Sequence, residues 1–113
     1  MHIKEKIQGE VAVVVFDGDL LDENDSSALR QKISSLLIDG IRKIVFDLRS
    51  LRQINKNGLD TMLGVFRQTR AYGGDIRIAQ IDAEPGNLFV KTRLANTFTS
   101  YETVGRALAS FMT

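Results

Sequence analysis

Two mostly apolar runs in the first half of the chain constrain its fold more than any other feature. Residues 11–16 are continuously apolar and mostly β-branched, and residues 43–48 are apolar apart from Lys43 and Asp47. Runs of this kind form strands that are buried on both faces, as in sheets covered by helices. Between them, Leu29, Ile33 and Leu36 recur at the spacing of one side of a helix. A strand, a helix and a second buried strand predict a right-handed parallel crossover, and therefore an α/β fold.

The alternation of strands and helices continues through the rest of the chain and predicts one domain over residues 1–113. We expect a mixed sheet of roughly four to five strands, packed with about four α-helices, in which the first two strands can pair antiparallel. Periodicity leaves open whether the helices cover one face of the sheet or both. Strands are expected near 3–7, 11–16, 43–48 and 75–81, with a further short strand near Phe98 and a loop at 49–57. Helices are expected before Gly40, from Gly58 towards Tyr72, from Glu84-Pro85 to about Thr92, and around 104–111.

Composition excludes several classes of protein. The chain has no Cys, which removes disulfide scaffolds, thiolate zinc sites and thiol nucleophiles, and its single His at position 2 leaves no histidine triad or cluster. The 15 basic and 14 acidic side chains nearly cancel, which argues against a general binder of nucleic acid or of membrane surfaces. The first residues form no apolar leader, and no run is long enough to span a bilayer. We therefore expect a cytoplasmic protein with no direct nucleic-acid contact and no membrane insertion.

Three aspartates, Asp17, Asp22 and Asp47, lie at or near the ends of predicted strands, where α/β folds place their chemistry. If they converged, they would suit Mg²⁺. The simpler interpretation is that Asp17 and Asp22 belong to turns or helix caps and that Asp47 ends a strand. No glycine-rich phosphate loop accompanies them, because Gly73-Gly74 ends a predicted helix rather than starting one. The sequence therefore favours a protein that is not an enzyme and holds no metal.

The polar loop before the second long helix carries three cations, Arg49, Arg52 and Lys56, and no acidic residue. Asn57 is the expected N-cap of the helix, with Asp60 three residues later facing the exposed amides. A cationic loop that leads into the positive end of a helix attracts anions. A solvated loop explains the same residues, and the sequence alone leaves both interpretations open.

Several short motifs occur in a characteristic order along the chain. They are Gly18-Asp19-Leu20-Leu21-Asp22, Val45-Phe46-Asp47-Leu48, Ile54-x-x-x-Gly58-Leu59, Arg70-x-x-Gly73-Gly74, and the late residues Leu94, Phe98, Tyr101-Glu102 and Ala107-Leu108. Together with the order of elements, these motifs resemble the STAS domain, the fold of bacterial anti-sigma factor antagonists. The resemblance covers essentially the whole chain.

In that family the loop before the second helix reads Asp-Ser-Ser/Thr-Gly-Leu. The resemblance implies that the serine after the aspartate accepts phosphate from an anti-sigma factor that is also an ATP-dependent kinase. The phosphate breaks the complex, since a hydroxyl in the interface gains about two negative charges. The matching positions here are Asn55, Lys56, Asn57 and Gly58. Lysine offers no hydroxyl, so this switch cannot operate at position 56: either binding is constitutive or the partner is no longer a serine kinase.

We therefore expect a protein-binding module without a cofactor, whose partner is an anti-sigma factor or serine kinase-like protein that controls transcription. Its binding surface comprises the loop before the second helix, the exposed face of that helix and the neighbouring strand-to-helix loop. The residues are Asp22, Asn24, Asn55, Lys56, Asn57, Gly58, Asp60, Thr61 and Arg67. A second hypothesis is a small-anion or nucleotide sensor, or a scaffold subunit of a larger STAS assembly, that uses Arg49, Arg52 and Lys56. Self-association into a homodimer through Phe89 and Phe98 also stays open.

Overall fold

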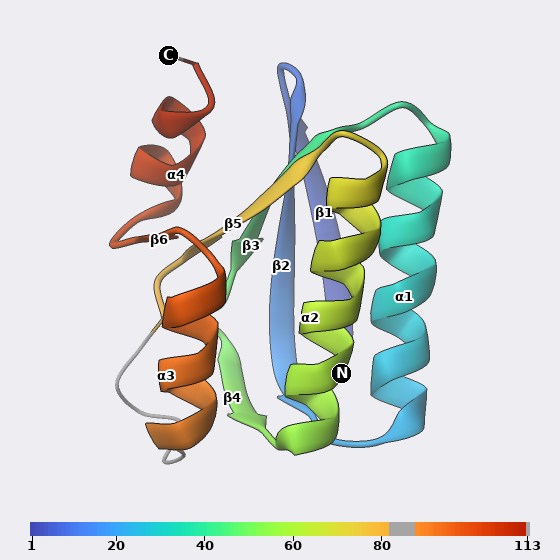
Figure 1. The fold of residues 1–113 in the computed structure, drawn as a ribbon, viewed down its shortest axis with the longest axis vertical. Helices are drawn as coiled ribbons and strands as arrows, with labels where there is room; N and C mark the ends of the chain where they lie inside the picture. Colours follow the sequence, from blue (N-terminus) through green and yellow to red (C-terminus); the bar gives the residue numbers. More distant parts are fainter. Residues whose placement is uncertain (82–87, 113) are drawn as a thin grey trace.

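The computed structural model describes residues 1–81 and 88–112, the side chains of 88–91 excepted. Within these residues a six-stranded mixed sheet has the strand order β1-β2-β3-β5-β6, with β4 pairing the end of β2. Four helices pack on the sheet (Figure 1). The elements are β1 (His2–Gln8), β2 (Val11–Leu20), α1 (Glu23–Ile38), β3 (Lys43–Asp47), β4 (Leu51–Ile54), α2 (Lys56–Ala71), β5 (Asp75–Ala79), α3 (Leu88–Thr97), β6 (Ser100–Tyr101) and α4 (Val104–Ser110).

The apolar run in β2 makes it an interior strand, with β1 on one side and β3 on the other. It pairs antiparallel with β1 through a tight hairpin that closes with Gln8 opposite Val11, and Gly9 takes φ +63° in this turn. On its other side β2 runs parallel to β3, and β3, β5 and β6 continue the parallel part of the sheet. The predicted α/β crossovers and the antiparallel opening pair are both confirmed.

Helices cover both faces of the sheet, but unequally. Alternate residues of β2 belong to two separate cores: Ala12 and Val14 lie in the main core, and Val11 and Val13 lie in a smaller one. The main core is covered by α1, α2 and α3, whereas the smaller core is covered by α4 through Ala107. Periodicity left open whether helices cover one face of the sheet or both. In the structure three helices form a large layer on one face, and the single short helix α4 covers the other (Figure 1).

The segment 49–57, expected to be a loop, contains the strand β4, so this expectation was wrong. β4 pairs in parallel with the last residues of β2, which continues past its apolar run to Leu20. Leu51 and Ile54 are buried in the main core, while the two residues between them are exposed. Four residues with this irregular pattern carry no strand signal of their own, and the pairing with β2 creates the strand.

The C-terminal third also differs in detail from the expectation. Helix α3 ends at Thr97 rather than near Thr92, and its expected start at Glu84-Pro85 lies outside the described residues. The short strand expected near Phe98 is β6, two residues long. With β4 and β6 both present, the sheet has six strands instead of four to five.

Phe98 belongs to the interior. Only 3% of it is exposed, and its ring centroid lies 4.8 Å from that of Phe66 and 6.3 Å from that of Phe46. It therefore offers no exposed patch for a homodimer, and the side chain of Phe89 lies outside the described part. No helix among the described residues is both long enough and apolar enough to cross a membrane.

Candidate functional site

Helix α2 is capped by Asn55 and not, as expected, by Asn57. The side-chain Oδ1 of Asn55 accepts a hydrogen bond from the Gly58 amide at 2.9 Å, and its carbonyl accepts one from the Leu59 amide at 2.9 Å. Asn57 is the second helical residue, and its side chain is exposed. Both asparagines suit an N-cap by type. Asn55 is selected because its amide has a second partner.

That second partner lies in the neighbouring loop. The Nδ2 of Asn55 donates a hydrogen bond to the carbonyl oxygen of Leu21 at 2.8 Å, which ties the start of α2 to the connection between β2 and α1. A carboxylate could cap the helix but has no proton to donate to this carbonyl. The amide at position 55 therefore holds two loops of the expected binding surface together.

Gly58 makes the close packing of α2 possible. A Cβ at this position would lie 2.4 Å from the backbone oxygen of Leu20 and 2.9 Å from Cγ1 of Ile54. Any side chain would push the first turn of α2 away from β2 and β4. Because Gly58 is buried, it positions the expected surface rather than contributing a contact to it.

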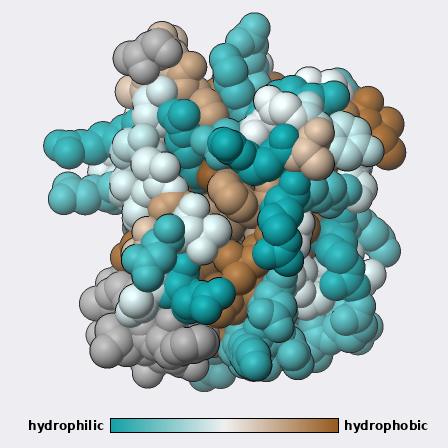
Figure 2. Space-filling view, in the orientation of Figure 1, coloured by the Kyte–Doolittle hydropathy of each residue, from teal (hydrophilic) through white to brown (hydrophobic). Residues whose placement is uncertain are grey.

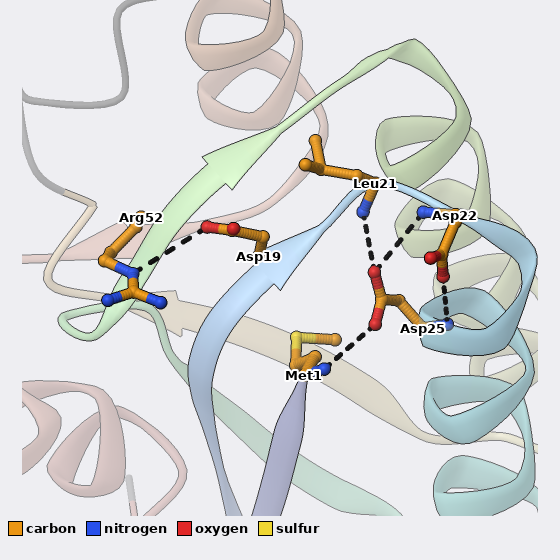
Figure 3. A network of polar contacts seen from close by, with 6 residues as sticks. All are labelled: Met1, Asp19, Leu21, Asp22, Asp25 and Arg52. Atoms are coloured by element: carbon orange, nitrogen blue, oxygen red, sulfur yellow. Dashed lines mark hydrogen bonds and ion pairs between the residues drawn. The ribbon is translucent and has the colours of Figure 1, made fainter.

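The start of α1 forms the second part of the site (Figure 3). Asp22 is the N-cap, and its Oδ1 accepts a hydrogen bond from the Asp25 amide at 2.9 Å. In return the carboxylate of Asp25 accepts hydrogen bonds from the amides of Leu21 and Asp22, and it pairs with the N-terminal ammonium of Met1 at 3.0 Å. This reciprocal capping box fixes the loop whose carbonyl Asn55 binds.

The capping box shifts the pKa of two charged groups. Burial would raise the pKa of Asp25, but hydrogen bonds from the Leu21 amide, the Met1 ammonium and the Asp22 amide outweigh it and lower the pKa. The hydrogen bond to Asp25 raises the pKa of the Met1 ammonium. Each group thus favours the charged form of the other.

Thr61 connects the two helices of the site. Its Oγ1 lies 2.7 Å from Oγ of the buried Ser26 in α1 and 3.0 Å from the carbonyl oxygen of Asn57. The hydroxyl of Thr61, which was expected in the binding surface, is therefore engaged in a contact between the two helices.

Most of the other expected binding residues form the outer surface of this region. Asp22 and Asn24 on the α1 side are exposed, as are Lys56, Asp60 and Arg67 on α2. Lys56 is the first residue of α2, and the first turn of this helix carries no acidic residue. A cation at this end opposes the helix dipole, so Lys56 does not stabilise α2.

Two of the three cations of the anion hypothesis, Arg49 and Arg52, border different hollows. Arg49 borders a hollow of about 470 Å³ beside Gln80 and Tyr101. Arg52 lies at a different hollow, where its Nε is 3.8 Å from a carboxylate oxygen of Asp19 (Figure 3). The structure brings these side chains to separate places.

Of the three aspartates singled out from the sequence, Asp22 and Asp47 have structural roles, whereas Asp17 is exposed and borders the same hollow as Asp22. No three acidic, histidine or cysteine side chains among the described residues are placed to hold a metal ion. Asp22 is a helix cap, and Asp47 accepts a hydrogen bond from the amide of Arg49 at 3.1 Å. Convergence of these carboxylates, which a metal-dependent enzyme would need, is not seen.

Sequence reasoning missed a groove between α1 and α2. It has a volume of about 380 Å³ and is lined by Arg30 of α1 and by residues of α2, namely Asp60, Thr61, Gly64, Val65 and Gln68. The one available signal was Gly64, a glycine in the middle of an otherwise strong helical pattern.

Comparison with known proteins identifies the family. The model of the STAS domain family matches residues 2–107. The chain belongs to the STAS domain family. This assignment confirms the resemblance drawn from the motifs, and it agrees with the strand order and the helical layers described above.

Solved structures with this STAS fold come from proteins of different kinds. A protein described as an anti-sigma factor antagonist from Thermotoga maritima superimposes with a TM-score of 0.85 at 18% identity, covering 98% of this chain and 95% of that one. An anti-sigma factor antagonist from Mycobacterium paratuberculosis gives a TM-score of 0.82 at 21% identity, covering 99% and 94%. The murine anion transporter Slc26a9 gives 0.71 at 15% identity over 92% of this chain, which corresponds to 18% of the transporter. At these identities the likeness establishes the fold.

Proposed function

We propose that this STAS domain is a non-catalytic antagonist that binds an anti-sigma factor and so regulates sigma-factor-dependent transcription. The binding surface is formed by the start of α1 and the start and exposed face of α2. The observation that carries the proposal is the bond from Asn55 to Leu21, because it holds these two loops as one surface. The likeness to anti-sigma factor antagonists along nearly the full chain supports the same function.

Lys56 sets the regulation of this surface. It stands at the position of the family's phospho-acceptor, is exposed, and gives α2 no electrostatic benefit. A surface cation that does not stabilise its own helix is available to an acidic group on a partner. We therefore assign Lys56 to partner recognition, with binding that is not switched by phosphate at this residue.

The anion-sensor hypothesis has weaker support, because Arg49 and Arg52 border different hollows. A scaffold subunit of a larger STAS assembly would bind other STAS domains instead of an anti-sigma factor. The binding experiment below therefore distinguishes an antagonist from a scaffold.

The test uses the purified chain and each anti-sigma factor of its source organism, expressed singly, with binding measured by calorimetry with and without ATP. One anti-sigma factor is expected to bind, and Lys56→Glu should weaken that binding about tenfold or more, since it replaces an attraction with a repulsion. Lys4→Glu, at an exposed position on β1, makes the same charge change away from the surface and should leave the affinity unchanged.

After the chain is incubated with the anti-sigma factor that binds it and with ATP, mass spectrometry should find no stoichiometric phosphate on residues 49–61. Failure of every anti-sigma factor to bind would overturn the proposed function. Equal effects of Lys56→Glu and Lys4→Glu would overturn the assignment of the surface.

A further inference from the structure

Gly64 has no explanation within the fold. It lies near the middle of α2, where glycine costs about 1 kcal/mol relative to alanine. Unlike Gly58, it has open space around it, since a Cβ at position 64 would meet no atom within 4 Å. Its φ is not positive either. The missing side chain therefore leaves room on the outside of α2 for something that is not part of this chain.

Two unpaired charges flank this gap on the exposed face of α2. Asp60 lies one turn before Gly64 and Arg67 one turn after it, so the two charges are about 10 Å apart along the helix. Both side chains are exposed, and within residues 1–81 and 88–112 neither makes a hydrogen bond or an ion pair through its side chain. Figure 2 shows hydrophilic surface over α2 itself and apolar surface beside it, on the side towards α3.

This arrangement is complementary to itself. If a second α2 lies antiparallel across the first, with the two-fold axis beside Gly64, then Asp60 of each copy faces Arg67 of the other. The glycines meet at the crossing, where small residues allow two helices to approach closely. Towards the ends of the contact Asn57 faces Arg70, whose charge is already paired with Asp75 at 3.5 Å. No pair of unneutralised like charges lies directly opposite in this register.

We propose that the exposed face of α2 is an isologous interface with a second copy of this chain, centred on Gly64. One helix face buries less than the roughly 1,600 Å² of a standard interface, so the dimer is weak, with a dissociation constant on the order of 0.1–1 mM. The dimer does not depend on the proposed function. If that function also holds, the dimer covers Asp60 and Arg67, and self-association competes with binding of the anti-sigma factor.

The charge pairs give a direct test by sedimentation equilibrium at low salt, up to a protein concentration of about 1 mM. The chain is expected to dimerise. Asp60→Lys or Arg67→Glu alone places like charges opposite each other at two symmetric positions and should weaken the dimer about tenfold or more. The double variant Asp60→Lys with Arg67→Glu exchanges the charges and should restore it. An equimolar mixture of the two single variants should form a heterodimer, because each then carries the charges that the other lacks.

The glycine gap is tested separately. Gly64→Leu fills the gap while raising helix propensity, so the variant should fold at least as stably as the parent chain yet remain monomeric. Gly105→Leu is the matched control, because this glycine lies in α4 on the other face of the sheet. A Cβ at position 105 would meet only Oγ1 of Thr103, at 3.8 Å. Dimerisation of this variant should be unchanged.

A parent chain that stays monomeric at about 1 mM would overturn the proposal and leave the α2 face to a different partner. So would a dimer that neither charge reversal weakens. A chain that binds an anti-sigma factor but does not dimerise would overturn the dimer alone. A chain that dimerises but binds no anti-sigma factor would overturn the proposed function alone.

Discussion

At the scale of single residues, the site depends on the amide of Asn55 and on the absence of a side chain at Gly58. Asn55 replaces the family's aspartate and gains a donor for the Leu21 carbonyl. Gly58 matches the family and is required because the backbone of Leu20 lies where its Cβ would be. Asn55, which differs from the family, and Gly58, which matches it, therefore both hold the start of α2 close to the end of β2.

Replacing Asn55 with alanine removes both of its hydrogen bonds. The helix cap and the tie to Leu21 are lost together, so Asn55→Ala should lower the free energy of unfolding by roughly 1–3 kcal/mol. Urea denaturation measures this change. Asn55→Ser is the control, because its hydroxyl still caps α2 and only the tie is lost, so it should cost less. An Asn55→Ala variant as stable as the parent chain would contradict the role assigned to this amide.

At the scale of elements, the N-terminus of α1 is held by a carboxylate that works only when it is ionised. Asp25 accepts hydrogen bonds from the amides of Leu21 and Asp22 and pairs with the Met1 ammonium. The same loop carries the carbonyl that Asn55 binds. Protonation of Asp25 therefore weakens the α1 cap and the support of the binding surface at once.

The lowered pKa of Asp25 predicts the direction of an acid effect on stability. A carboxyl group whose pKa is lower in the folded than in the unfolded protein stabilises the fold above its unfolded pKa of about 4. That contribution is lost as the pH falls through the folded-state value. The parent chain should therefore be more stable than Asp25→Asn near neutral pH, and the difference should shrink as the pH falls below about 4. A difference that stays constant on acidification, in urea titrations at each pH, would contradict this prediction.

At the scale of the whole molecule, the sheet divides the protein into a large core and a small one. Phe46 is fully buried in the large core against Phe16, with ring centroids 4.9 Å apart. In the small core the half-buried Phe111 lies under Arg77, with the guanidinium carbon 4.0 Å from the ring centroid. The proposed surface belongs to the helices of the large core, so α4 supports the sheet from the far side.

The two cores should contribute unequally to stability. Phe46→Leu leaves a cavity among fully buried neighbours and should cost about 1–2 kcal/mol. Phe111→Leu keeps most of its contacts with the sheet and mainly loses the cation–π contact, so its cost should stay at or below about 1 kcal/mol. Thermal and urea unfolding measure both. An equal or larger loss for Phe111→Leu would show that α4 carries more of the stability than its seven residues suggest.

The sequence by itself determined the type and order of most elements, because burial and helical spacing are written in local patterns. The run of residues 11–16 predicts a strand buried on both faces, and the apolar stripes of α1 and α2 predict amphipathic helices. The family followed from the same local landmarks in order. For Lys56, on which the proposed regulation depends, the sequence predicted a place in the loop before the helix, whereas the structure makes it the exposed first residue of α2.

Tertiary structure alone decided which asparagine caps α2, that residues 51–54 form a strand, and that α4 covers the opposite face. Each of these depends on a partner far away in the chain: Asn55 is chosen by a carbonyl 34 residues earlier, and β4 exists through its pairing with β2. Local propensity treats Asn55 and Asn57 alike, since both fit an N-cap. The free energy that separates them comes from a contact that forms only when the chain has folded.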